Sequence, residues 1–151
     1  MPLEAFNAGC NIIGLNKHGR NYGMCCAWAQ MIDYDKITML IGAQSVTGKI
    51  LTKGDIVGVS ALALGQEAIA LCLGSTHSDE NDKFTSINFH LDESAILIDG
   101  AKVIMKCRVI DIMHLSGIEA DFFVLLQVIH FQQSPSLVFL GAYNLPEMSA
   151  K

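Results

Sequence analysis

Charged side chains are scarce in this sequence. Asp, Glu, Lys and Arg together make up 17% of its 151 residues, and the formal net charge is -5. The Lys and Arg residues are scattered, with no basic run and no stripe of alternating basic and aromatic residues. Proteins that bind nucleic acids need such a positive surface to contact phosphates, so nucleic acid is not predicted as a partner.

The sequence also lacks a long apolar run. No stretch approaches the roughly 18 uninterrupted apolar residues of a membrane-spanning helix, and the longest candidate, residues 56–73, is interrupted by Gln66 and Glu67. The first ten residues have no basic segment followed by an apolar core, so no signal peptide is predicted. The five cysteines follow no disulfide-framework spacing, and there is no Asn-x-Ser/Thr sequon. We therefore expect a cytoplasmic protein with no membrane segment.

Apolar residues, in contrast, are abundant, at 51% of the chain. This content and length suit one domain with a full hydrophobic core, and they favour an oligomer that hides more surface than a monomer can. Because no internal repeat or linker is visible, we expect a single domain over residues 1–151.

Short apolar runs separated by turn-rich segments predict six or seven strands and two short helices. The expected strands cover residues 11–15, 24–32, 37–42, 55–62, 101–113, 122–131 and 137–141. A loop of five or six residues is expected to join the first two. Residues 122–131 are apolar at nearly every position, as in a strand that is covered on both faces.

The first helix is expected to begin at Ser45 or Thr47 and to end at Gly54, and the second to cover residues 65–73, before a polar loop over residues 74–88. The strands do not alternate regularly with long helices, which argues against a doubly wound parallel sheet. A small antiparallel β-barrel with helices at its ends is therefore predicted.

The adjacent cysteines Cys25 and Cys26, in the segment GMCCAWAQ, raise the question of a thiol site. A catalytic dithiol usually has two intervening residues and lies at a helix N-terminus. Neighbours on a strand point to opposite faces, so this pair can neither share a metal nor form an unstrained disulfide. We interpret both as small buried side chains. Cys10, Cys72 and Cys107 stand alone in the sequence, and no His pair has ligand spacing, so no zinc site is predicted.

The segment GAQSVTGK, residues 42–49, superficially resembles a phosphate-binding loop. Its glycines are separated by five residues rather than four, and an isoleucine follows where magnesium binding requires a hydroxyl residue. It still offers the hydroxyls of Ser45 and Thr47, close backbone approach at Gly48 and the charge of Lys49, all at a predicted helix N-terminus. Two interpretations of this segment therefore remain: an anion-binding site and an ordinary helix cap.

Other polar residues give weaker signals. In NDKF, residues 81–84, Lys83 could reach a phosphate and Phe84 could pack on a ring, although a solvated loop is the simpler interpretation. His114 and His130 flank the last predicted hairpin, where either could face the mouth of a site. No Ser/His/Asp arrangement or close carboxylate pair occurs at motif spacing, so nucleophilic hydrolysis has no support.

Taken in order, these segments resemble the flavin reductase-like family, over about residues 11–141. GRNYGMCCAWAQMID resembles the hairpin and strand that line the flavin in the family. QSVTGKIL resembles the Ser-x-Thr segment that opens a helix and holds the flavin phosphate, and DIVGVSAL resembles the strand after it. NDKF resembles an Asp-Lys-Phe loop element, and residues 101–131 resemble the closing long hairpin.

The resemblance implies a mainly β fold, an antiparallel split β-barrel with short peripheral helices. It implies FMN as cofactor, with FAD less favoured, and NADH or NADPH as a co-substrate. It also implies a homodimer with the flavin near the interface, in which a partner subunit completes the pocket. The implied flavin-binding residues are Met24, Cys25, Cys26, Ala27, Trp28, Ala29, Ser45, Val46, Thr47, Gly48, Lys49, Val59, Ser60, Ala61 and Lys83. No metal ligand and no catalytic acid or base is assigned.

One departure from the family pattern concerns the nicotinamide. The last hairpin of the family often carries a Gly-Asp-His turn, whereas here Phe122 follows Asp121. The leading hypothesis is an FMN-binding oxidoreductase that moves hydride or electrons between a reduced nicotinamide and flavin or a downstream acceptor. The alternatives are a flavin-binding electron carrier or redox sensor without its own NAD(P)H reaction, and a barrel that has lost its cofactor and serves as a structural module.

Overall fold

The computed structural model describes residues 3–42, 45–75, 83–118 and 120–145. Within these residues it contains nine strands, two α-helices and one 3-10 helix. In chain order these are β1 (Asn11–Lys17), β2 (Arg20–Cys26), β3 (Ala29–Asp33), β4 (Lys36–Gly42), α1 (Val46–Ile50), β5 (Ile56–Ala61), α2 (Glu67–Ser75), β6 (Phe89–Asp92), β7 (Ala95–Ile98), β8 (Val103–Met113), β9 (Asp121–Gln133) and η1 (Ala142–Asn144).

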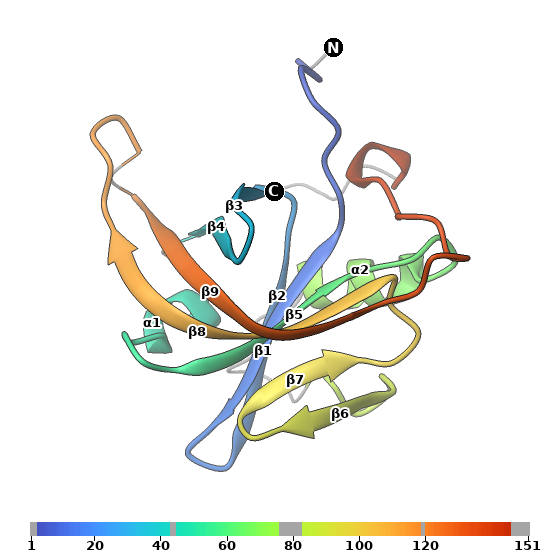
Figure 1. The fold of residues 1–151 in the computed structure, drawn as a ribbon, viewed down its shortest axis with the longest axis horizontal. Coiled ribbons are helices and arrows are strands. Elements are labelled where there is room, and N and C mark those ends of the chain that lie inside the picture. The colour runs from blue at the N-terminus through green and yellow to red at the C-terminus, as the bar shows by residue number, and fades with distance from the viewer. Residues whose placement is uncertain (1–2, 43–44, 76–82, 119, 146–151) are drawn as a thin grey trace.

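All strands join one antiparallel sheet in the order β3-β4-β9-β8-β5-β1-β7-β6, and β2 pairs with β1. The sheet curls strongly, and the long β8–β9 hairpin wraps across the front of the molecule in Figure 1. Among the described strands, β2 and β3 form no ladder with each other, although the chain passes directly from one to the other. The predicted mainly β, antiparallel split barrel is therefore confirmed.

Two apolar clusters fill the molecule. The barrel core consists of Ile13, Leu15, Cys26, Ile37, Met39, Ile41, Leu51, Val57, Val59, Cys107, Val109, Val124 and Leu126. The outer core, which includes residues of α2, consists of Cys10, Ile12, Leu62, Ala70, Leu73, Phe84, Ile87, Ile96, Ile98, Ala101 and Leu140. Side chains alternate between the two faces of a strand, so β1 contributes to both cores.

The first hairpin is tighter than expected. Lys17 pairs directly with Arg20, leaving a two-residue loop rather than five or six residues. Both loop residues, His18 and Gly19, have positive φ, at 56° and 77°, as a type I′ turn requires. The strand expected over residues 24–32 is interrupted after Cys26 and resumes as β3.

The helix boundaries and the C-terminal region also differ from the expectation. α1 ends at Ile50, because Gly54, with φ of 92°, lies in a separate turn where the Asp55 carboxylate accepts from the Thr52 amide. The β6–β7 hairpin was not predicted, since its two runs of four residues are short. The strand expected over residues 137–141 is wrong: this segment makes only isolated bridges.

β9 is not covered on both faces, contrary to the prediction. Val124 and Leu126 are buried in the barrel core, whereas Ile129 and Phe131 are 44% and 55% exposed. The reason lies in the register: β4 pairs with β9 only as far as Gln127, and beyond that point β9 pairs with β8 alone. Among the described residues, no helix has the length and apolar character needed to cross a membrane.

The contact between β5 and β7 gives a stability prediction. A Cβ added at Gly58 would overlap the backbone carbonyl of Ile96, which cannot rotate away as a side chain can. We expect Gly58→Ala to lower the free energy of unfolding by about 3 kcal/mol, the upper end of overpacking costs, as measured by urea denaturation. Gly9→Ala is the matched control, because its nearest contact is 3.6 Å away and the change should be nearly neutral. Equal stability of the two variants would contradict the close β5–β7 packing.

Candidate functional site

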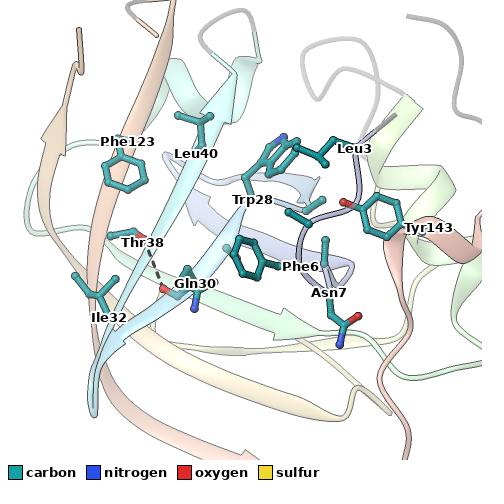
Figure 2. A pocket seen from close by; sticks show the side chains of 14 residues that line it. Leu3, Phe6, Asn7, Trp28, Gln30, Ile32, Thr38, Leu40, Phe123 and Tyr143 are labelled. Carbon is teal, nitrogen blue, oxygen red and sulfur yellow. Dashed lines mark hydrogen bonds between the residues drawn. The ribbon is translucent and has the colours of Figure 1, made fainter. Parts of the chain in front are cut away.

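An open cavity of about 600 Å³ lies on the outer face of β3 and β4 (Figure 2). This volume is within the range of small-molecule sites, about 300–1,000 Å³. The cavity is lined by Leu3, Ala5, Phe6, Asn7, Ala8, Ala27, Trp28, Ala29, Gln30, Ile32, Thr38, Leu40, Phe123 and Tyr143. Three of the predicted site residues, Ala27, Trp28 and Ala29, are among them.

Strand alternation builds one wall of the cavity. In β4, Thr38 and Leu40 face the cavity, while the residues between and beside them belong to the barrel core. The entry to β3 is fixed by two hydrogen bonds from β4: the Leu40 amide donates to the Trp28 carbonyl at 2.9 Å, and the Thr38 hydroxyl donates to the Gln30 carbonyl at 3.5 Å. Trp28 is thereby held at the cavity although β2 has already ended.

The two ends of the described chain build the other wall. The N-terminal arm, residues 3–8, runs beside the segment that contains η1, as Figure 1 shows. The Ala142 amide donates to the Ala8 carbonyl at 2.8 Å, and the Cys10 amide donates to the Leu140 carbonyl at 3.2 Å. These bonds bring Tyr143 and Phe6 to the same cavity, and Figure 2 shows both near Trp28.

The lining is apolar, aromatic and uncharged. Trp28 is 66% exposed and Phe6 84% exposed, so large apolar surfaces meet solvent at the rim. None of the described lining residues is Asp, Glu, Lys, Arg or His. Exposed apolar patches of this kind mark binding or association sites. The cavity therefore suits a flat, largely uncharged ring system, and among its described lining residues Tyr143 alone carries a titratable group.

The adjacent cysteines point to opposite faces of β2, as the strand geometry predicts. Cys26 is buried in the barrel core, and its thiol donates to the Leu40 carbonyl at 3.2 Å. Burial raises the pKa of the Cys26 thiol to about 11, so it is protonated at neutral pH. Cys25 packs against the outer core instead. Neither cysteine lines the cavity. The small side chains that line it in this segment are Ala27 and Ala29.

Cys10 stands alone in the sequence but lies beside another cysteine in the fold. Cys10 lies in the outer core, Cys25 packs against that core, and each thiol shifts the pKa of the other. The two residues lie far apart in the sequence, and only the β1–β2 register brings them together.

The segment at the start of α1 has a clear structural role. Ser45 caps the helix, since its hydroxyl accepts from the Gly48 amide at 2.9 Å. A Cβ at Gly48 would lie 2.9 Å from the Gly42 carbonyl oxygen, so close packing explains the glycine. Thr47 is buried, whereas Lys49 is exposed. These contacts support the interpretation of this segment as an ordinary helix cap. They give no role to the exposed side chain of Lys49.

The start of α1 follows the end of β4. Gly42 lies two residues beyond Leu40 in β4, about 7 Å along the strand. The Ser45 amide donates to the Gly42 carbonyl at 3.1 Å. No residue of α1 lines the cavity, and Gly48 packs against Ile41 of the barrel core.

Four other predicted residues belong to the scaffold. Val59 and Ala61 are buried side chains of β5, and Ser60 between them is fully buried, with its hydroxyl accepting from the Ile98 amide at 3.0 Å. Met24 is half-buried against the barrel core. These side chains support the walls from behind and do not line the cavity.

The NDKF segment also faces away from the cavity. Asn81 and Asp82 lie outside the described residues. Lys83 is buried, and its ammonium group donates to the Leu73 carbonyl at 3.2 Å in the last turn of α2, where the helix dipole favours a cation. Phe84 is an outer-core residue that packs edge-on against Phe89, so it is not available to a ligand ring.

The two histidines of the last hairpin are elsewhere too. The His114 ring packs edge-on against Phe122, with centroids 5.1 Å apart. His130 lines a separate hollow of about 120 Å³ together with His90 and Lys106. Within the part of the chain that the structure describes, no three His, Cys, Asp or Glu side chains are grouped so as to hold a metal ion.

The sequence analysis did not predict most of the residues that line the cavity. Period-two alternation through Trp28, Gln30 and Ile32, and through Thr38 and Leu40, could have assigned the β3–β4 wall. The arm carries no such signal, because Leu3 and Phe6 are placed by contacts between chain ends rather than by local pattern.

Comparison with known proteins agrees with this architecture. The model of the flavin reductase-like domain matches residues 3–142. The fold is similar to the NADH:FAD oxidoreductase SgcE6 of Streptomyces globisporus C-1027, with a TM-score of 0.80 and 22% identity over 89% of this chain and 80% of that one. It is also similar to an FMN-binding protein from Thermus thermophilus (TM-score 0.77, 17% identity, 90% and 78% covered) and to flavoredoxin from Methanosarcina acetivorans (0.74, 13%, 89% and 75%). No curated protein gives a significant sequence match.

Proposed function

The chain belongs to the flavin reductase-like family of oxidoreductases, and from this premise we propose that it binds FMN and transfers hydride or electrons between a reduced nicotinamide and flavin or a downstream acceptor. The observation that carries the proposal is the uncharged aromatic cavity on the outer face of β3 and β4. The similar proteins include both FAD- and FMN-binding members by name, so FMN is the finer part of the proposal.

The cavity fits the ring of a flavin. An isoalloxazine needs an apolar slot with a few polar groups at its edge. Trp28, Phe6 and Tyr143 supply aromatic surface, and the small side chains of Ala27 and Ala29 allow a ring to approach the backbone closely. The Gln30 amide, the Thr38 hydroxyl and neighbouring backbone groups offer the polar contacts. We therefore assign the ring to this cavity.

We assign the phosphate to the segment from Ser45 to Lys49. The Ser45 hydroxyl accepts one backbone hydrogen bond and retains its own donor hydrogen. Lys49 is exposed and adds a positive charge in α1, the helix that follows β4. Val46 and Thr47 would contribute mainly through their backbone groups, because Thr47 is buried, whereas the Gly48 amide already donates to the Ser45 hydroxyl.

The protein's contribution is binding, orientation and exclusion of water. A bound flavin supplies the redox chemistry itself. The aromatic walls shield the ring from solvent, and the hydrogen bonds from β4 fix Trp28 before any ligand arrives. Since no lining residue is charged, no proton transfer to a side chain is assigned.

The homodimer and the cytoplasmic location expected from the sequence stay predictions. The exposed side chains of Leu3, Phe6, Trp28 and Ile32 around the cavity support association, since a partner would cover them. Light scattering tests this directly: a mass of 16.4 kDa at micromolar concentration would contradict the homodimer.

A second candidate function is a flavin-binding electron carrier without its own nicotinamide reaction. Two observations favour it. Phe122 stands where a turn histidine is common in the family, and it packs on His114. In addition, the described cavity lining holds no cation to receive a nicotinamide diphosphate.

Flavin binding has a built-in reporter. Trp28 is the only tryptophan and lines the cavity, so FMN should quench its fluorescence saturably at micromolar concentration. Trp28→Phe should abolish this signal while FMN binding remains detectable by the shift in flavin absorbance. If the tryptophan emission is unchanged while FMN binds, the ring lies elsewhere. If no binding is seen by either measurement, the protein is not a flavoprotein.

The phosphate assignment is tested by comparing FMN with riboflavin. Lys49→Ala should weaken FMN binding about tenfold, as expected for the loss of one charge-assisted contact, and should leave riboflavin binding unchanged. Lys53→Ala is the matched control, because Lys53 is also exposed and pairs with Asp111 at 3.3 Å. Equal effects of the two variants, or equal effects on the two flavins, would place the phosphate away from α1.

Nicotinamide use separates the two candidate functions. When the FMN complex is mixed anaerobically with NADH or NADPH in a stopped-flow instrument, the leading proposal predicts rapid bleaching of the flavin absorbance band. Bleaching no faster than with free FMN would support the electron carrier. Photoreduction of the same complex is the control that its flavin is reducible.

A further inference from the structure

The β1–β2 hairpin brings together two cysteines that are distant in the sequence. Its register pairs Ile12 with Cys25 and Asn11 with Cys26. Cys10 precedes Ile12 by two residues and Ile12 is paired with Cys25, so Cys10 and Cys25 lie on the same face as diagonal neighbours. Cys10 belongs to the outer core and Cys25 packs against it, and each thiol shifts the pKa of the other.

The remaining cysteines are directed elsewhere. Cys26 and Cys107 lie in the barrel core, on the opposite side of the sheet formed by β1 and β2. The Cys72 thiol is 3.7 Å from the Lys83 carbonyl oxygen, to which it donates. Cys10 and Cys25 are therefore the two sulfurs that the fold sets against each other.

The pKa values of the two thiols are shifted in opposite directions. The interaction with Cys25 lowers the pKa of the Cys10 thiol, while burial acts in the opposite direction. The same interaction raises the pKa of the Cys25 thiol well above its usual range, and burial raises it further. Cys10 is thus the better nucleophile, since the thiolate is the reactive form. Cys10 is buried and Cys25 is half-buried, so a small oxidant has to reach the Cys10 sulfur from the Cys25 side of the pair.

We propose that Cys10 and Cys25 are a reversible dithiol that hydrogen peroxide converts to a disulfide. The Cys10 sulfur attacks one peroxide oxygen, the O–O bond breaks, and water leaves with a proton from the thiol. The Cys25 sulfur then attacks the oxidised Cys10 sulfur, the S–S bond forms, the S–O bond breaks, and a second water leaves. The two thiols lose two electrons and two protons, and one peroxide becomes two waters.

The spacing favours a reversible bond over a permanent one. Diagonal neighbours lie about 7 Å apart, near the upper limit for a disulfide. A bond formed there needs a small backbone adjustment, and strained disulfides are reduced more easily than relaxed ones.

The pair is next to the cavity on both strands. Cys10 follows Ala8 by two residues, Cys25 precedes Ala27 by two residues, and both alanines line the cavity. A disulfide would fasten the root of the N-terminal arm to the end of β2. The proposal concerns the chain's own thiols, so it stands or falls independently of flavin binding.

The test uses the reduced full-length chain without added flavin. The protein is treated with hydrogen peroxide under native conditions and quenched in mildly acidic denaturant containing excess N-ethylmaleimide. Intact mass spectrometry should show that two of the five cysteines escape alkylation, and a non-reducing peptide map should show one Cys10–Cys25 cross-link. Dithiothreitol should restore all five alkylations. Five alkylations after treatment, a different cross-link, or oxidation that ends at one sulfur would each overturn the proposal.

Variants provide a second measurement. Cys10→Ser and Cys25→Ser should each abolish the loss of two thiols, whereas Cys72→Ser, a half-buried control packed against the same outer core, should retain it. If a variant does not fold, the peptide map of the wild-type chain still decides the question. Loss of two thiols in folded Cys10→Ser would contradict the pairing.

Discussion

The double burial of β1 is the constraint on which the rest of the structure depends. Its residues Ile12 to Leu15 are buried on both faces, with Ile13 in the barrel core and Ile12 in the outer core. The strand is also paired on both edges, with β2 on one side and with β5 and β7 on the other. A one-residue slip of β1 would exchange the side chains of the two cores, so this strand fixes the register of its neighbours.

The cavity arises where that pairing ends. β2 follows β1 only as far as Cys26, and the chain then leaves for β3 on a different part of the sheet. The outer face of β3 and β4 is left without a covering helix, and the N-terminal arm, held at Ala8 by the Ala142 amide, closes one side of it. The site is thus an edge of the barrel that the fold leaves open rather than a hole through its core.

The local sequence pattern predicted the strands that carry a strong apolar signal. It did not predict the elements whose position depends on tertiary contacts. β4, β5 and β8 lie close to their predicted positions, and the helix cap at Ser45 follows from its chemistry. The β6–β7 hairpin was missed because its runs are short. The exposure of the second half of β9 was not predicted, because the apolar residues of β9 do not indicate where its pairing with β4 ends. Of the residues that the family resemblance implied as flavin-binding, Ala27, Trp28 and Ala29 line the cavity, whereas Ser60 and Lys83 make internal hydrogen bonds.

The separation of apolar and charged groups in the site has a physical consequence. The cavity walls are uncharged, and Lys49 lies beyond the end of β4 in solvent. A ring in the cavity would be held by stacking and by exclusion of water, which salt affects little, whereas an exposed cation is screened over about 8–10 Å at ordinary ionic strength. The two halves of a phosphorylated aromatic ligand would therefore respond differently to salt. Ring binding would set the orientation of such a ligand, and the charge would act mainly on specificity and on the rate of association.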